Sequence, residues 1–258
     1  MKTIRKTIVI GAFVLLINPV FGQDARQIAD RAANSIDLEA MEMVATLITK
    51  DDKGNERVRQ IATVTKKFDG TTKTMMKFLS PADVKGTAML VYDYKQKNDD
   101  MWIYLPALRK TRRIVSSEKA KSFMGTEFSN ADMSKPNMDD FTYALLGSEM
   151  INGKDCWKVE TKCINEDIED QNGFSRKVVY IEKSTYLMQK MEYYDLDGEL
   201  YKVMTVSDYR KQSNGSYFAY NMSIENLQTN RKSVMQVDKF QMGSSMNESS
   251  FSAAKLGT

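Results

Sequence analysis

The chain has 258 residues, with 37 Lys and Arg against 34 Asp and Glu for a formal net charge of +3, and it contains no histidine. Without histidine it has no Ser-His-Asp or Cys-His nucleophile, no histidine-ligated metal and no imidazole base. The 42% share of hydrophobic residues is that of a folded protein, and a chain of this length buries about 70–75% of its unfolded surface.

Residues 1–22 have the pattern of a secretory signal peptide. Lys2, Arg5 and Lys6 precede an apolar run over 8–17, whereas a membrane-spanning helix needs about twenty residues. We expect cleavage between Gly22 and Gln23, which leaves 23–258 as a single exported domain. Cleavage leaves 34 of the 37 basic residues against 34 acidic ones, so the charge excess of a nucleic-acid-binding protein is missing.

One short amphipathic helix opens the mature chain. Asp24 followed by Gln27 is typical of a helix start. The apolar residues that follow share one helical face: Ile28, Ala29, Ala32, Ala33 and Ile36. From Met41 the apolar period changes to two, which predicts a strand that ends in a turn at 51–55.

Further alternating runs predict a succession of strands. They cover 57–67, 73–79, 87–94, 101–105, 111–115, 155–163, 174–182, 186–194, 199–209, 216–226 and 231–241. Turn signals such as Asp69-Gly70 and Asn152-Gly153 separate them, which favours one large antiparallel meander. Residues 116–150 interrupt the alternation, and we expect a loop there with one or two short helices, the better one over 139–146.

A sheet of eleven or twelve strands in a chain of this size is expected to curl into a barrel or half-barrel, which creates an inside. Methionine is frequent, with 18 residues, and its adaptable thioether side chain suits a promiscuous apolar cavity. Ordinary core packing is the alternative interpretation of these methionines.

Two cysteines lie in one strand-like run. Cys156 and Cys163 are seven residues apart, which places them on opposite faces of a strand. A disulfide between them requires the strand to bend, and the alternative is two separate core residues.

The segment 109–113 carries four cations in five residues: Arg109, Lys110, Arg112 and Arg113. They predict a docking patch for anionic head groups or an acidic partner. The alternative is an edge strand protected from aggregation by charge. The acidic pairs Asp99-Asp100 and Asp139-Asp140 are the candidates for acid–base chemistry, but they lie in a turn and near a helix start. We therefore expect no catalytic residue.

Three blocks between residues 78 and 133 carry a recognisable pattern: FLSPADVKGTAMLVYDY, MWIYLPALRKTRRI and SFMGTEFSNADM. By these blocks the chain resembles the LolA-like outer-membrane lipoprotein-sorting proteins, and the remainder agrees in its alternating strand pattern. The resemblance implies a mainly β (α+β) fold. A curved antiparallel sheet of about eleven strands forms a half-open barrel, with helices as a lid over a hydrophobic cavity.

The resemblance also implies a function. The protein is expected to be a periplasmic carrier or chaperone, not an enzyme, that shields acyl chains of lipoproteins or lipids during transfer to the outer membrane. No cofactor or metal is implied. The implied partners are the acylated lipoprotein or lipid cargo, an inner-membrane transporter and an outer-membrane acceptor, with the protein itself a monomer.

Two other functions stay open. One is an envelope sensor or accessory subunit of a lipid exporter, which would use residues 109–113 to contact a membrane partner. The other is a hydrolase that uses carboxylates alone.

Strand parity groups the candidates for the cavity lining, although it does not decide which face points inward. The expected lining residues are Met41, Met43, Leu47, Met76, Phe78, Met89, Val91, Trp102, Tyr104, Phe218 and Met222.

Overall fold

The structure is a computed structural model that describes residues 20–36, 38–94 and 97–257. The predicted signal segment, up to residue 19, lies outside the described residues. The α-helices are α1 (Val20–Ala33) and α2 (Glu166–Asn172). The strands are β1 (Ala40–Lys50), β2 (Glu56–Phe68), β3 (Thr71–Ser80), β4 (Ala88–Asp93), β5 (Asp100–Leu105), β6 (Lys110–Ile114), β7 (Phe141–Ile151), β8 (Lys154–Cys163), β9 (Arg176–Glu182), β10 (Met188–Tyr194), β11 (Leu200–Lys211), β12 (Tyr217–Asn226) and β13 (Arg231–Met242).

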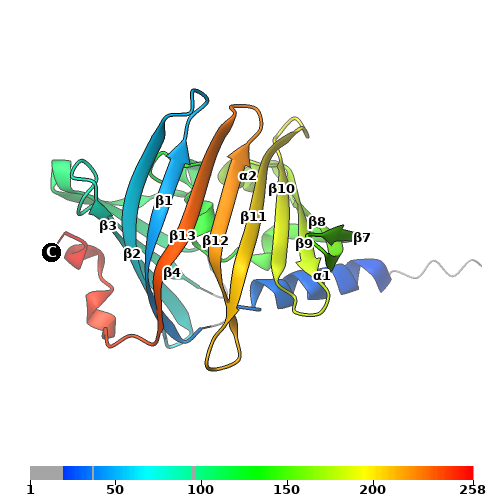
Figure 1. The fold of residues 1–258 in the computed structure, drawn as a ribbon, viewed down its shortest axis with the longest axis horizontal. Helices are drawn as coiled ribbons and strands as arrows, with labels where there is room; N and C mark the ends of the chain where they lie inside the picture. Colours follow the sequence, from blue (N-terminus) through cyan, green and yellow to red (C-terminus); the bar gives the residue numbers. More distant parts are fainter. Residues whose placement is uncertain (1–19, 37, 95–96, 258) are drawn as a thin grey trace, which may run out of the picture.

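In this described part, thirteen strands form one curved antiparallel sheet with the order β6-β5-β4-β3-β2-β1-β13-β12-β11-β10-β9-β8-β7 (Figure 1). The predicted mainly β fold is confirmed. Strands consecutive in sequence are neighbours except β6 and β7, which lie at opposite edges, and β1 pairs in addition with β13. The chain between β6 and β7 must therefore cross the whole width of the sheet.

The tight hairpin turns form where the sequence predicted them. Asp69 and Gly70 have φ angles of 44° and 81°, and Asn152 and Gly153 have φ angles of 50° and 78°. Two consecutive positive φ angles give a turn whose twist matches that of the flanking strands, and Asn-Gly and Asp-Gly adopt them readily. These turns fix the register of the strands on either side.

The helix predicted over 139–146 is wrong, because this segment is part of strand β7. Phe141, Tyr143 and Leu145 alternate with more exposed residues, and β7 pairs with β8 from Phe141 opposite Cys163 to Ile151 opposite Lys154. Asp139-Asp140 indicated a helix start, but they form a single 3₁₀ turn, Met138–Asp140. Pairing with β8 decides the conformation, and aromatic residues suit such a half-buried surface.

The two cysteines are free and buried. Cys163 belongs to the main apolar cluster, whereas Cys156 packs with Val178 and Tyr180 in a separate cluster. The strand carries them on opposite faces without a bend, as two core residues. No helix in the described part of the chain is long and apolar enough to span a bilayer.

Candidate functional site

The crossing segment, residues 115–140, runs between the two edges of the sheet and packs against its inner face. In Figure 1 it lies behind the strands. Phe123 and Phe128 are 1% and 2% exposed and belong to the main apolar cluster, and the Phe123 ring stacks on Phe78 of β3 at 6.0 Å between centroids. We call the inner face of β1–β6, together with these phenylalanines, the filled half.

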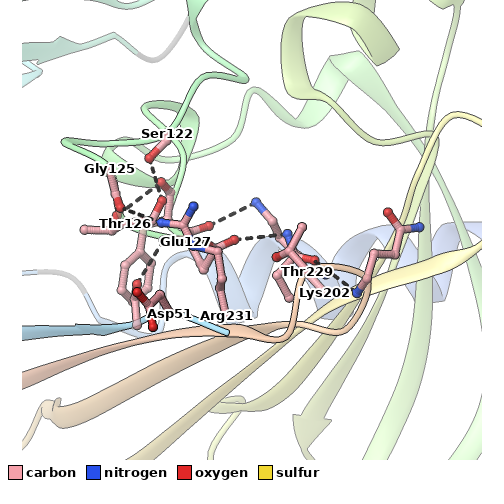
Figure 2. A network of polar contacts seen from close by, with 12 residues as sticks. Asp51, Ser122, Gly125, Thr126, Glu127, Lys202, Thr229 and Arg231 are labelled. Carbon is pink, nitrogen blue, oxygen red and sulfur yellow. Dashed lines mark hydrogen bonds and ion pairs between the residues drawn. The ribbon is translucent and has the colours of Figure 1, made fainter. Parts of the chain in front are cut away.

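Buried polar contacts fix the crossing segment to the ends of β11–β13 (Figure 2). The backbone N–H of Glu127 donates to Ser233 Oγ (2.9 Å), and its carboxylate lies 3.0 Å from Arg231 Nε and accepts a 3.0 Å hydrogen bond from Asn226. Lys202 donates to the Glu127 carbonyl at 3.0 Å, and burial lowers the pKa of this lysine. The network holds the phenylalanines in place.

The inner face of β8–β12 beneath α1 is different, and we call it the hollow half. It encloses an apolar cavity of about 280 Å³. Its apolar lining comes from α1 and Ile36 after it, from the strands and from two residues of the crossing segment: Ala29, Ala32, Ala33, Ile36, Pro136, Met138, Phe141, Val179, Ile181, Met188, Met191, Val206, Ala219 and Met222. Ala29 and Ala32 pack against the cluster of Val159 and Ile181, but their methyl groups are too short to fill the space over the rest of this face.

Five polar side chains also line this cavity: Ser35, Tyr143, Thr161, Lys177 and Tyr209. The hydroxyl of Tyr209 donates to the Met188 carbonyl at 2.5 Å, and that of Tyr143 donates to the Met138 carbonyl at 3.1 Å. Lys177 is the charged one, and burial lowers the pKa of its ammonium group. The hydroxyl of Ser35 donates to the Ala32 carbonyl at 2.7 Å, and Lys177 is the one cation among the described residues that line the cavity.

The structure distributes the predicted lining residues over different places. Met222 lines the cavity. Six others do not line the cavity but belong to, or pack against, the main apolar cluster that also contains Phe123 and Phe128 of the crossing segment: Met43, Leu47, Met76, Phe78, Met89 and Val91. Met41 is partly buried and lies between Thr65 and Met242 in the sheet.

Trp102, Tyr104 and Phe218 are not among the residues that line this cavity, and Trp102 and Tyr104 lie on the opposite, outer face of the sheet. Trp102 and Tyr104 pack around Phe251 of the C-terminal segment, and Phe218 stacks on Phe240 at 4.2 Å between ring centroids. Because the C-terminal segment covers this part of the outer face, the strands are apolar on both sides. Alternation alone therefore did not reveal the inward face.

Several cavity residues did not follow from strand parity. Met188 and Met191 are three residues apart yet both line the cavity, because the pairing of β10 with β9 shifts register between Met188 and Lys190. Val206 and Tyr209 are likewise three apart, and Asp208 between them has a φ of 53°. Irregular backbone of this kind reverses the parity of a strand. Ala29 and Ala32 were visible in the sequence as one helical face.

The four cations of 109–113 lie at the sheet edge formed by β6. Arg112 pairs with Glu118 at 2.6 Å, and Arg113 pairs with Asp100. Arg109 and Lys110 are exposed and form no ion pair within the described residues. The charged edge strand that the sequence suggested is present.

The acidic pairs considered for catalysis are engaged elsewhere. Asp100 pairs with Arg113, and Asp139 pairs with Arg26 of α1. Burial raises the pKa of Asp99 and of Asp140. These carboxylates lie outside the apolar cavity.

The sequence and the fold are similar to those of known proteins. A family model described as "-like: Uncharacterized protein" matches residues 70–258. A putative outer membrane lipoprotein-sorting protein domain from Vibrio parahaemolyticus is 26% identical with a TM-score of 0.85, over 92% of this chain and 100% of that one. A DUF1329 family protein from Desulfovibrio piger is 27% identical with a TM-score of 0.83, over 91% of this chain and 98% of that one.

A LolA superfamily protein from Nitrosomonas europaea, 17% identical with a TM-score of 0.68 over 90% of this chain and 98% of that one, shares the fold. No curated protein matches the chain in sequence. The family match over 70–258 includes all three sequence blocks that first indicated the resemblance. The chain therefore belongs to the family of this model, and the predicted resemblance to LolA-like outer-membrane lipoprotein-sorting proteins is confirmed by the structures that share its fold.

Proposed function

We propose that the protein is a periplasmic carrier or chaperone, without catalytic activity, that shields an acyl chain of a lipid or lipoprotein in the hollow half during transfer to the outer membrane. The observation that carries the proposal is the apolar cavity of about 280 Å³ beneath α1. Small-molecule sites in proteins measure about 300–1,000 Å³. A cavity just below this range suits one chain rather than several.

The energetics favour such a carrier. Each buried methylene contributes about 0.8 kcal/mol, so a chain of roughly fifteen carbons offers on the order of 12 kcal/mol before costs. A rigid site that captured all of it would release its cargo slowly, because affinity differences appear mainly in the off-rate. Met188, Met191 and Met222 line the cavity, and flexible thioethers adapt to cargo without a rigid fit.

The signal peptide expected at 1–22 supplies the route to the periplasm. We further propose that Arg109, Lys110, Arg112 and Arg113 dock a membrane partner, such as an inner-membrane transporter or an outer-membrane acceptor. The exposure of Arg109 and Lys110 supports this surface. Reversing both charges is expected to weaken partner binding and to leave lipid binding unchanged. Loss of lipid binding would contradict a separate docking surface.

The direct test measures binding of a fluorescent fatty acid to the mature protein, together with mass spectrometry of lipid that co-purifies from its native envelope. In the variant Ala32→Phe an aromatic ring occupies the cavity, and we expect the affinity to fall by at least about 10-fold, as the loss of two to three buried methylenes would produce. Ala82→Phe, at an exposed position outside the cavity, is the matched control. Absence of binding by the wild type, or equal binding by both variants, would refute the proposal.

A further inference from the structure

Lys177 is an unusual residue for the wall of an apolar cavity. It lies in β9 two residues from Val179, and both side chains line the cavity of the hollow half. Its ammonium nitrogen lies 4.7 Å from the ring centroid of Phe174, 5.4 Å from that of Phe141 and 5.8 Å from that of Tyr193. Three aromatic faces attract a cation, but they leave its N–H donors without a carboxylate or carbonyl acceptor.

The protein offers this ammonium group no hydrogen-bond acceptor. Within residues 20–36, 38–94 and 97–257, no group accepts a hydrogen bond from Lys177 Nζ and no carboxylate forms an ion pair with it. Asp132 acts on it electrostatically. The Asp132 carboxylate, however, accepts hydrogen bonds from the backbone and hydroxyl of Ser129, at 2.7 and 2.8 Å, and from Tyr193 at 3.1 Å.

Other partly buried lysines of the sheet are satisfied. Lys190 lies 2.6 Å from a Glu192 oxygen, Lys154 lies 2.8 Å from a Glu182 oxygen, and Lys202 donates to the Glu127 carbonyl. An ammonium group has three donors, and no protein group that the structure describes accepts a hydrogen bond from those of the partly buried Lys177. Lys177 borders the cavity, so an acceptor for its donors can come from a molecule within it.

We infer that the cavity takes a free fatty acid, whose alkyl chain occupies the hollow half and whose carboxylate pairs with Lys177. This inference rests on the proposed carrier function and narrows its cargo to chains that end in a carboxylate. An acyl chain joined to a protein through a neutral amide would leave the ammonium group without a directly paired anion. A carboxylate supplies both the charge and the acceptor oxygens.

The strand geometry accommodates such a ligand. Lys177 and Ile181 lie four residues apart on the same face of β9, which corresponds to about 13 Å at roughly 3.3 Å per residue. Val179 lies between them, and Ile181 packs beneath Ala25 and Ile28 of α1. An alkyl chain that starts at Lys177 and runs along β9 therefore stays in contact with apolar side chains until it reaches the helix.

The test compares palmitate with hexadecanol, which has the same chain length and no charge, on the delipidated mature protein. A charge-assisted hydrogen bond is expected to make palmitate bind about 10–100-fold more tightly than hexadecanol. In Lys177→Met, a change of similar length, the two affinities are expected to lie within about 3-fold, with hexadecanol binding retained. Lys162→Met, an exposed lysine on β8, is the control and is expected to keep the wild-type preference.

Each other outcome is informative. Equal affinities in the wild type, or a preference that persists in Lys177→Met, would overturn the fatty-acid inference and leave the carrier function standing. Failure of both ligands to bind would overturn the inference and the carrier function together. Thermal unfolding establishes that Lys177→Met is folded. If Lys177→Met is not folded, the ratio of the wild-type affinities for palmitate and hexadecanol decides whether the fatty-acid inference holds.

Discussion

The filled half and the hollow half are parts of one sheet, and they differ in what covers them. The crossing segment inserts Phe123 and Phe128 into the filled half, whereas α1 presents Ala29 and Ala32 to the hollow half. A loop follows the sheet closely and sends large side chains into it. A helix keeps its axis about 8–10 Å from its neighbours, so methyl side chains leave a space. The covering element therefore decides where the cavity lies.

The two covers are also fixed differently. The crossing segment is held by the buried carboxylate of Glu127. The polar contacts of α1 with the rest of the protein are exposed: Arg26 pairs with Asp139, and Arg31 donates to the hydroxyl of Tyr186 at 2.8 Å. Exposed pairs contribute little to stability. We expect α1, rather than the crossing segment, to move when cargo enters.

The largest predicted difference between the two halves is the loss of stability when a large apolar side chain is replaced by alanine. Phe123→Ala removes a side chain that is 1% exposed, and we expect the free energy of unfolding to fall by about 3–5 kcal/mol. Met191→Ala enlarges a cavity that already exists, and we expect a loss below about 2 kcal/mol. Urea denaturation of both variants measures the difference. Equal losses would mean that the two halves are packed alike.

The second-largest loss of stability is expected at Glu127, whose contacts anchor the crossing segment to β12 and β13. Glu127→Ala removes the partner of Arg231 and Asn226. We expect a loss of about 2 kcal/mol, less than for a fully buried ion pair because Arg231 is partly exposed. Glu39→Ala is the control, since its ion pair with Lys67 involves a carboxylate that is 85% exposed, and it is expected to cost below about 1 kcal/mol. Similar losses in both variants would contradict the role of the anchor.

The pH dependence of stability tests the contact between the crossing segment and β4. Burial and the neighbouring Asp99 raise the pKa of Asp93 to about 6, and its carboxylate accepts a hydrogen bond from the backbone of Lys135 at 3.3 Å. The unfolded chain loses this proton at a lower pH than the folded protein does, so the free energy of unfolding falls as the pH rises from about 4 to about 6.

Allowing for partial exposure of Asp93, we expect a decline on the order of 1 kcal/mol. Chemical denaturation at intervals across this pH range measures it. Asp93→Asn is expected to remove this part of the decline. An identical pH profile in the variant would show that another group is responsible.

The smallest effect is expected at the exposed edge. Arg112→Ala breaks the ion pair with Glu118, but the Arg112 side chain is 52% exposed, so the free energy of unfolding is expected to change by less than about 1 kcal/mol. Thermal unfolding at low and high salt checks this value. A loss comparable to that of Glu127→Ala would make this edge a second anchor of the crossing segment.

Much of the fold follows from local sequence. The alternating runs and the turns at Asp69-Gly70 and Asn152-Gly153 predict the strands closely. The exception is β7. Asp139-Asp140 suggested the start of a helix there, but hydrogen bonding to β8 makes the segment a strand. The pairing of β1 with β13 joins residues far apart in the chain, and no local pattern indicates it.

The residues of the candidate site were harder to predict from the sequence than the strands. Parity grouped Met76, Met89 and Met222 correctly as inward-facing, but it did not reveal that the crossing segment covers the first two. Trp102 was misplaced because the outer face has its own apolar cover. Lys177 is one of many lysines in the sequence, and its distinction is the absence of a hydrogen-bond acceptor among the described residues. That property depends on the folded surroundings.

The methionine methyl groups provide the most direct test of the central claim, since they lie in both halves. In protein labelled with ¹³C at these methyls, a spin-labelled fatty acid broadens the resonances of groups near the bound chain. We predict broadening of Met188, Met191 and Met222 in the hollow half, with Met76, Met89 and Met101 of the filled half largely unaffected. Broadening of the second set, or of both sets equally, would contradict a cargo site in the hollow half.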